Sequence, residues 1–432
     1  MKILTLNPES KKNLLTSLLK RGIGQYPEQE KTVAAIIEDV KNEGDAALFR
    51  YTQLFDNCRL NAMSIRVTKA EMATAYEGVE PELIAVLKRA AANIAAFHEK
   101  QLKNSWFDIK ADGSILGQRI SPLDICGVYV PGGKAAYPAS ALMNIIPAKV
   151  AGVGRIVMVT PPDGAGHIPD ATLVAADIAG VDEIYKLGGA QAIAAMAFGS
   201  ESVPKVDKIT GPGNIYVTLA KKACFGHVGI DSLAGPSEIL ILADEGASPA
   251  HVAADLLSQA EHDELASAIL VTTSRRLAEQ VLAQIDKYLE TLSRAGIIRA
   301  SLENYGFILL AGDMEEAIAL CNDIAAEHVE IMTAAPFELM PKIRHAGSIF
   351  LGAYSPEPLG DYFAGPNHIL PTNGTARFSS PLSVDDFTKK TGIIAYTAAA
   401  LSRDGGDIVR FAENEGLTAH ANTVKVRERC IT

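Results

Sequence analysis

Residues 127–150, GVYVPGGKAAYPASALMNIIPAKV, indicate which class of fold the chain adopts. An apolar strand at 127–130 ends at a turn that contains Pro131, Gly132 and Gly133, and an apolar helix follows from about residue 139 to residue 150. Strand, turn and helix in this order form the repeating unit of a parallel sheet covered by helices. The stretch therefore favours an α/β protein.

The same unit is repeated along most of the chain. Further strands are predicted at residues 155–160, 183–187 and 208–210, and a second series at 239–243, 268–272, 306–310, 329–332 and 348–351. Predicted helices lie between them, among others at 171–179, 190–198, 249–261, 276–289 and 314–326. Glycine-bearing turns follow several strands, and ligands of parallel sheets bind beyond such strand ends. Residues 1 to about 105 are predicted to be mainly helical, and the C-terminus forms a helical tail.

Composition limits the partners that the chain could have. With 432 residues, 48% of them hydrophobic, it is long enough for two or three domains of about 150 residues each. A net charge of −11 argues against nucleic acid or an anionic membrane as the main partner. The sequence shows neither a signal peptide nor an apolar run of spanning length, and its five cysteines are widely spaced. We therefore expect a cytoplasmic protein with reduced thiols.

Two candidate metal ligands lie at the C-terminal end of the helix predicted at 249–261 and are expected on the same face of it. Gln259 and His262 are three residues apart, so their side chains leave the same side of a helix. A neutral amide is a poor ligand, and a single histidine on a helix is more often an ordinary polar residue. The pair alone is weak evidence for a metal site.

Three residues further along the chain add to this pair. Asp361 and His368 lie in a stretch, 352–383, that lacks regular patterning, and long loops of this kind are usually functional. His420 lies in the helical tail, where an exposed helical face is the simpler interpretation. Asp361 and His368 could likewise be turn residues. A site of nitrogen and oxygen ligands would suit zinc, and manganese less well.

An acid and an imidazole stand side by side where a predicted helix ends and a strand begins. Glu327 and His328 could form a general acid and base pair, or His328 could simply be a polar residue that ends a helix. The sequence around Glu327 and His328 favours neither of these two interpretations. No Gly-x-Gly-x-x-Gly follows a strand, because Gly152-x-Gly154 precedes one, so spacing alone is only weak evidence for a dinucleotide.

Several motifs in fixed order resemble the histidinol dehydrogenase family. They are GGAQAIAA at 188–195, TGPGN at 210–214, AGPSE at 234–238, SQAEH at 258–262 and GPNH at 365–368. The similarity runs from about Arg21 to the end of the chain. It implies an enzyme that oxidises L-histidinol to L-histidine, the last step of histidine biosynthesis, in two hydride transfers to two NAD molecules. It also implies one zinc ion per subunit and a homodimer.

Carried over by motif, the resemblance assigns a role to each candidate residue. The zinc ligands would be Gln259, His262, Asp361 and His420, and these four residues would also contact the substrate. Further substrate contacts would be Ser237, His328, His368 and Glu415, and the catalytic pair would be Glu327 and His328. The NAD contacts would be Tyr129, Gln191 and Asn214. Ala326 stands where many relatives have proline, and Ser232 where methionine is usual. The first departure affects the support of the catalytic turn.

The resemblance also implies a domain arrangement. Two incomplete Rossmann-like parallel-sheet domains are expected: residues 23–128 with 237–383 would carry the metal and catalytic residues, and 129–236 would bind NAD. A small N-terminal helical arm (1–22) and a C-terminal helical tail (384–432) would complete the chain, with the tail contributing to the dimer and to the neighbour's site. A metal-dependent hydrolase is the alternative function, since zinc, glutamate and histidine also activate water. A zinc-bearing binding protein without turnover is a third.

Overall fold

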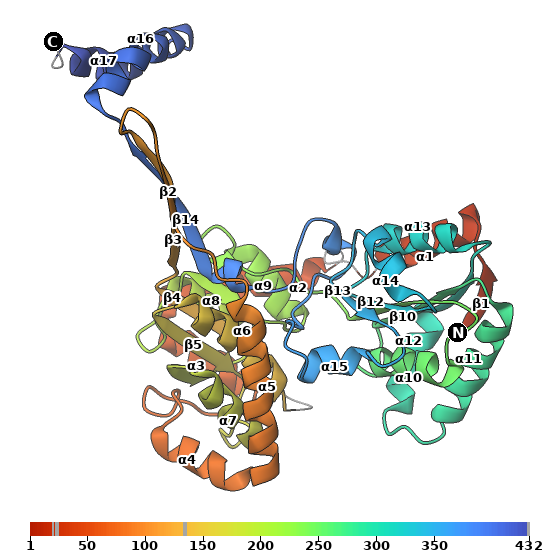
Figure 1. The fold of residues 1–432 in the computed structure, drawn as a ribbon. Coiled ribbons are helices and arrows are strands. Elements are labelled where there is room, and N and C mark those ends of the chain that lie inside the picture. The colour runs from red at the N-terminus through yellow and green to blue at the C-terminus, as the bar shows by residue number, and fades with distance from the viewer. Residues whose placement is uncertain (20, 22–25, 133–135, 430–432) are drawn as a thin grey trace. The chain divides into compact units, whose positions relative to one another are not determined.

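The computed structural model describes residues 1–19, 21, 26–132 and 136–429, and the chain divides into two units. The first unit comprises Met1–Gln101 and Leu123–Phe387, and the second comprises Leu102–Pro122 and Thr388–Thr432. Both parallel sheets belong to the first unit, and a small antiparallel sheet with the two last helices belongs to the second (Figure 1). Among the described residues, no helix is long and apolar enough to cross a membrane.

The larger sheet of the first unit has six parallel strands in the order β1-β11-β10-β9-β12-β13. They are β1 (Lys2–Thr5), β9 (Glu238–Ala243), β10 (Ser267–Thr272), β11 (Gly306–Leu310), β12 (His328–Met332) and β13 (Ser348–Leu351). In β9, Ile239 and Ile241 enter one core, and Leu240 and Leu242 enter the other. Helices α10 (Pro249–Ala260), α11 (Arg275–Tyr288) and α12 (Ala295–Tyr305) cover the first face, and α1 (Pro8–Leu19) and α13 (Met314–Ile324) cover the second. Burial on both faces explains why the central strands β9 and β10 are almost continuously apolar.

The smaller sheet has five parallel strands in the order β6-β5-β4-β7-β8. They are β4 (Ile125–Tyr129), β5 (Arg155–Thr160), β6 (Glu183–Lys186), β7 (Lys208–Thr210) and β8 (Gly229–Ile230). Helices α4 (Lys69–Gly78), α5 (Pro81–Glu99), α6 (Pro138–Ala151) and α7 (Asp170–Ala179) cover one face, and α2 (Pro27–Glu43), α3 (Asp45–Phe55), α8 (Gly189–Phe198) and α9 (Ile215–Cys224) cover the other. The chain order reverses between β4 and β7, and such a reversal opens a crevice for a ligand.

These two sheets confirm the predicted α/β fold, but the N-terminus differs from the predicted arm at residues 1–22. β1 pairs with β11, with Lys2 opposite Phe307 and Thr5 opposite Leu310. Arg21 is buried as well, and its guanidinium donates a hydrogen bond to the carbonyl oxygen of Leu265 (2.9 Å). A strand this short gives no clear period, and its partner lies far along the chain, so sequence patterning misses it.

The helices of residues 27–99 also differ from the predicted grouping, in which residues 23–128 join 237–383. Val33 and Ile36 of α2 and Leu48 of α3 pack in the core of the smaller sheet, and Leu87 of α5 packs on its other face. An amphipathic helix shows which of its faces is buried but not which sheet buries it. The smaller sheet is therefore covered both by helices that precede β4 in the sequence and by helices that follow it.

The second unit contains a strand where the sequence predicts only a helical tail at 384–432. β14 (Thr388–Ala395) pairs antiparallel with β3 (Ile115–Pro122), and β3 pairs with β2 (Trp106–Ile109) through the hairpin predicted at Asp112-Gly113. Gly113 has φ +80°, as the turn requires. Two helices follow, α16 (Ala398–Asn414) and α17 (Thr418–Glu428). The pairing of β14 with β3 joins distant segments, which local patterning does not show.

Candidate active site

One cavity of about 1350 Å³ lies in the first unit, lined by residues of both parallel sheets. The smaller sheet contributes residues that follow strands, such as Pro131 after β4 and Pro212 after β7. The larger sheet contributes residues that precede or begin strands, such as Ser237 before β9 and His328 at the start of β12. The cavity therefore lies at the carboxyl edge of one sheet and at the amino edge of the other, whereas ligands of parallel sheets usually bind at carboxyl edges.

Glu327 and His328 are placed in this cavity by the sharp turn between α13 and β12. Ala325 ends the helix in the left-handed region (φ +53°), which only few residues other than glycine adopt. The following Ala326 is buried, and its carbonyl oxygen accepts a hydrogen bond from Gly347 N (3.0 Å). The turn is thus held by the backbone at the position where relatives were expected to have proline.

The His328 imidazole is held in one tautomer. Its Nδ1 lies 3.0 Å from the carbonyl oxygen of Glu238, and a carbonyl oxygen can only accept a hydrogen bond. Nδ1 therefore carries the proton, and Nε2 presents a lone pair. Burial lowers the pKa of His328 to about 4, so the ring is neutral at ordinary pH. A neutral imidazole with a free Nε2 can accept a proton from a substrate.

Glu327 lies beside this ring and is also buried. Its Oε2 accepts a hydrogen bond from Glu238 N (2.9 Å) and lies 3.7 Å from His328 Nδ1. Burial raises the pKa of the Glu327 carboxyl well above its usual range, and the charges of Glu238, Asp361 and Glu357 add to this rise. Positive charge bound in the cavity would oppose this rise and favour the ionised form, which can act as a base.

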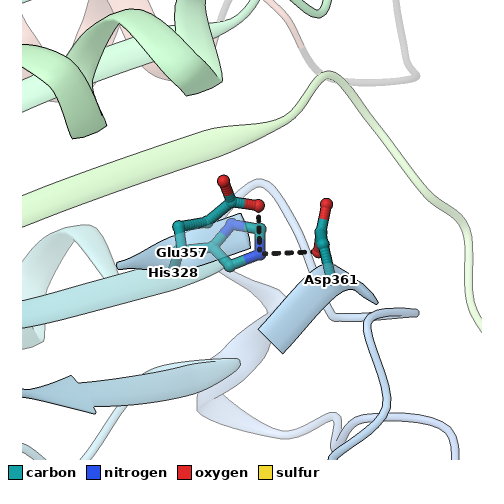
Figure 2. A group of neighbouring side chains, drawn as sticks. All are labelled: His328, Glu357 and Asp361. Atoms are coloured by element: carbon teal, nitrogen blue, oxygen red, sulfur yellow. Dashed lines mark ion pairs between the residues drawn. The ribbon is translucent and has the colours of Figure 1, made fainter. Parts of the chain in front are cut away.

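Two carboxylates face the free nitrogen of His328 (Figure 2). Glu357 Oε1 and Asp361 Oδ1, both on the short helix α15 (Glu357–Tyr362), lie 3.8 Å and 3.9 Å from His328 Nε2. The potential ligand atoms of these three residues lie within 4.8 Å of one another. Nitrogen and carboxylate oxygen at such separations are a donor set that a divalent cation could bridge.

His368 and His262 add imidazoles to the same region. His368 Nδ1 lies 3.1 Å from the carbonyl oxygen of Asp361 and 3.8 Å from its Oδ1, so this ring too carries its proton on Nδ1. Burial lowers the pKa of His368, and His262 lies near enough to lower the pKa of both His368 and His328 further. Together with Asp361, they form a group of imidazole nitrogens beside carboxylate oxygens.

Gln259 is the most unusual member of the predicted set. It is fully buried at the end of α10, and neither its Oε1 nor its Nε2 has a hydrogen-bond partner among the described residues. A buried amide without partners costs free energy, on the order of 1–3 kcal/mol. Its side chain lines the cavity, as do Ser237 and His262. A buried, unpaired amide in the cavity wall fits a site that binds a ligand.

Tyr129, Gln191 and Asn214 line the part of the cavity that the smaller sheet forms. Tyr129 Oη accepts a hydrogen bond from Gly189 N (3.2 Å), and the buried amide of Gln191 has no partner among the described residues. Asn214 Oδ1 caps α9 through Tyr216 N (3.0 Å), which leaves its amide nitrogen for a ligand.

Glycine is required in the turn just before the cavity-lining residue Pro212. Gly211 has φ +113°, and a Cβ there would lie 2.0 Å from the carbonyl oxygen of Tyr129. The turn between β7 and α9 therefore packs against the backbone of β4 more closely than a side chain at this position would allow. This contact fixes the path of the turn that leads into α9.

The comparisons with known proteins agree with this geometry. A family model described as histidinol dehydrogenase matches residues 19–428. The chain is 55% identical to a histidinol dehydrogenase of Halalkalibacterium halodurans over 428 residues, 99% of each chain, and 55% identical to one of Bacillus subtilis over 415 residues, 96% of this chain and 97% of that relative. A crystal structure of histidinol dehydrogenase from Elizabethkingia anophelis has a TM-score of 0.94 at 40% identity and covers 100% of this chain and 98% of that chain. The chain belongs to the histidinol dehydrogenase family.

Membership of the histidinol dehydrogenase family confirms the resemblance drawn from the five motifs. The predicted site residues that belong to the first unit all line one cavity. Asp361 and His368 are the last two of them in the sequence. Glu415, directly after α16, and His420, in α17, belong to the second unit, and both are exposed. Their roles stay predictions.

Sequence reasoning on this member of the histidinol dehydrogenase family missed Glu357. The side chain is 2% exposed, and burial raises its pKa to about 9. Pro356 followed by an acid is a common helix start, and Glu357 and Asp361 are four residues apart, which places them on one helical face. The sequence contains this helix-start pattern and spacing, but it does not show that the Glu357 side chain is buried.

Glu330 of β12 is a buried acidic residue whose ionisation affects the stability of the folded chain. It is 1% exposed, and its Oε1 accepts a hydrogen bond from Glu357 N (3.0 Å). Burial, then the charge of Asp255, raises its pKa well above the usual range. The folded chain keeps the Glu330 proton to higher pH than the unfolded chain, whose glutamates ionise at about pH 4.3. Stability contributed by this group is therefore lost as pH rises above that value.

We expect Glu330→Gln to be more stable than the wild type by a margin that grows as the pH rises above about 4.3, the pKa of an unperturbed glutamate. The neutral amide still offers an oxygen to Glu357 N, so the hydrogen bond is kept. Urea unfolding at several pH values measures the margin, with the exposed Glu338→Gln as the matched control. A margin that stays constant or shrinks with pH would contradict the raised pKa.

Proposed function

We propose that this protein oxidises L-histidinol through L-histidinal to L-histidine, the last step of histidine biosynthesis, with two NAD molecules and one zinc ion per subunit. The observation that carries this proposal is the single cavity in which the free Nε2 of His328 and the unpaired amides of Gln259 and Gln191 occur together. Membership of the histidinol dehydrogenase family over nearly the whole chain supports it.

Zinc would be held by Gln259, His262 and Asp361, and by His420 from a second copy of the chain. The buried, unpaired amide of Gln259 supports this set, because its oxygen otherwise has no partner among the described residues. When bound, zinc would hold the amine and imidazole nitrogens of the substrate and add positive charge among the carboxylates. Nitrogen and oxygen ligands of this kind suit zinc.

NAD would be held by Tyr129, Gln191 and Asn214, and when bound it supplies the acceptor for the hydride. Two observations support this position. The Gln191 amide is buried without a partner among the described residues, and α9 begins at the cavity wall directly after Asn214, so its first backbone N–H groups could bind a phosphate. Both lie where ligands of parallel sheets bind, beyond the carboxyl ends of β4, β6 and β7.

His328 and Glu327 would then divide the proton transfers. His328 Nε2 takes the proton of the alcohol as the carbon loses hydride, and it acts again in the second oxidation. Glu327 takes a proton from the water that adds to the aldehyde, a role that requires its ionised form. Ser237, His368 and Glu415 would orient the substrate, which stays bound between the two oxidations.

A homodimer would complete each site. The second unit exposes many apolar side chains, namely Trp106, Phe107, Ile109, Ile394, Tyr396, Ile408, Phe411, Leu417 and Val426. An apolar surface of this extent supports contact with another protein surface. Glu415 and His420 are exposed in this same unit, so a second copy of the chain could receive them in its own cavity.

The reaction is tested by incubating the purified protein with L-histidinol and NAD. We expect two NADH for each histidine formed, loss of activity after chelation, and recovery when zinc is returned. Magnesium, which prefers oxygen ligands, is the control cation and should not restore activity. Histidinol consumed without NADH would favour a metal-dependent hydrolase, and no turnover would favour a binding protein.

A further inference from the structure

Asp56 is an acidic residue of the cavity that the mechanism does not use. It follows the last residue of α3, and its backbone N–H is held by the carbonyl oxygen of Thr52 (2.9 Å). Its side chain lines the cavity beside Phe55 and near Tyr129. One carboxylate oxygen, Oδ2, is buried and has no hydrogen-bond partner among the described residues. A carboxylate held in a wall without a partner is costly unless a ligand satisfies it.

The backbone of Asp56 lies against the loop that follows β5. A side-chain carbon added at Gly164 of this loop would lie 3.8 Å from the carbonyl oxygen of Asn57 and 4.0 Å from that of Asp56. In chain order, β5 is the second strand of a sheet whose order is β6-β5-β4-β7-β8. In dinucleotide-binding sheets of this order, an acidic residue beyond the second strand accepts hydrogen bonds from the adenosine ribose.

The residues that directly follow β5 do not offer such an acid. Pro161 and Pro162 come first, and Asp163 is used within its own turn, where Oδ1 accepts hydrogen bonds from Ala165 N (2.9 Å) and His167 N (2.9 Å). Asp163 is also absent from the cavity wall, whereas Asp56 lines it with both prolines. Asp56 thus stands at the place of the usual acid but comes from a different element, α3.

The chemistry of the wall favours a diol over a phosphate. Two neighbouring hydroxyls can donate to the two oxygens of one carboxylate, whereas a 2′-phosphate would meet its negative charge. Of the described residues that line the cavity, one carries a guanidinium or ammonium group, Arg294, which precedes α12 on the larger sheet. Phe55, 51% exposed, and the prolines offer apolar surface beside the carboxylate for a base.

We infer that Asp56 binds the ribose hydroxyls of the adenosine half of NAD and makes the site select NAD over NADP. This inference rests on the proposed function, since it assigns a specificity-determining residue to the same cofactor. It also explains why an unpaired carboxylate is kept in the wall of a cavity that is already acidic. Burial raises the pKa of Asp56 to about 6, so the group is mainly ionised at neutral pH and can accept both hydroxyls.

The test measures binding of the reduced cofactors to the enzyme without substrate, by the fluorescence of bound NADH and NADPH. We expect the wild type to bind NADH much more tightly than NADPH. In Asp56→Asn, NADH binding should weaken by about 10-fold or more, because a charged hydrogen-bond acceptor is lost. NADPH binding should stay equal or become tighter, so the ratio between the two should fall. Glu77→Gln, the same change on the exposed face of α4, is the control and should leave the ratio unchanged.

Thermal unfolding separates a ligand role from a structural one. Since Asp56 Oδ2 makes no hydrogen bond within the described residues, Asp56→Asn should be at least as stable as the wild type; Asp56→Ser provides a second variant if the amide packs badly. An unchanged NADH to NADPH ratio in folded variants, while the wild type oxidises L-histidinol, would overturn this inference and leave the proposed function. A wild type that neither binds NADH nor forms it would overturn both.

Discussion

His328→Asn is expected to lose NADH formation from both L-histidinol and L-histidinal, with kcat lower by about 10²- to 10⁴-fold. The neutral ring presents a free Nε2 because Nδ1 is held by the carbonyl oxygen of Glu238. An asparagine amide nitrogen can still donate to that oxygen but offers no basic nitrogen. Glu327→Gln should slow mainly the second oxidation, because only that step needs a proton taken from water.

Steady-state assays that start from the alcohol and from the aldehyde separate the two steps. His251→Asn, an exposed histidine at the start of α10, is the matched control and should keep wild-type rates. NADH binding to His328→Asn should equal that of the wild type, which shows that the cavity is intact. Wild-type kcat on either substrate would remove His328 from its role, and aldehyde oxidation at the wild-type rate in Glu327→Gln would remove the glutamate.

Mixing two inactive variants should restore activity. If His420 completes the site of a second copy, His328→Asn and His420→Ala homodimers are both inactive, but a mixed dimer holds one site with both histidines intact. Random re-association makes about half of the dimers mixed, so total activity should reach about a quarter of the wild-type value. The mixture is denatured and refolded together, and each variant refolded alone is the control.

The outcome distinguishes a shared site from a site within one chain. If His328 and His420 of the same chain met, every chain of the mixture would lack one of them, and no activity would return. Zinc content gives an independent measure, since His420→Ala should hold less metal than the wild type. Equal zinc content would remove His420 from the ligand set even if the chain is a dimer.

Local patterning predicts the fold well where a strand is apolar, buried on both faces and followed by a clear helix. The strands at 155–160 and 306–310 lie where the sequence predicts them. The elements that patterning misses depend on distant partners: β1 on β11, and β14 on β3. A short or half-exposed strand has no period of its own that would reveal such pairing.

The candidate site was predicted from motifs more than from physics. Spacing alone suggested Gln259 with His262, but no pattern shows that the Gln259 amide is buried without a partner. Glu357 and Asp56 were missed for the same reason, since their burial and their neighbours arise only when distant segments pack. Residue type and order therefore located the chemistry, and tertiary structure was needed to find the groups that tune it.

Because the cavity lies between opposite sheet edges, helix ends of opposite partial charge lie on its two sides. On the smaller sheet, α8 and α9 begin directly after Gly188 and Asn214, so the positive ends of these helices lie at the cavity wall. On the larger sheet, α10 and α13 end just before His262 and Glu327, so negative ends lie there. Positive helix ends favour the phosphates of a dinucleotide, and negative ends favour a metal cation. By joining a carboxyl edge to an amino edge, the fold places helix ends of opposite sign on the two sides of one cavity.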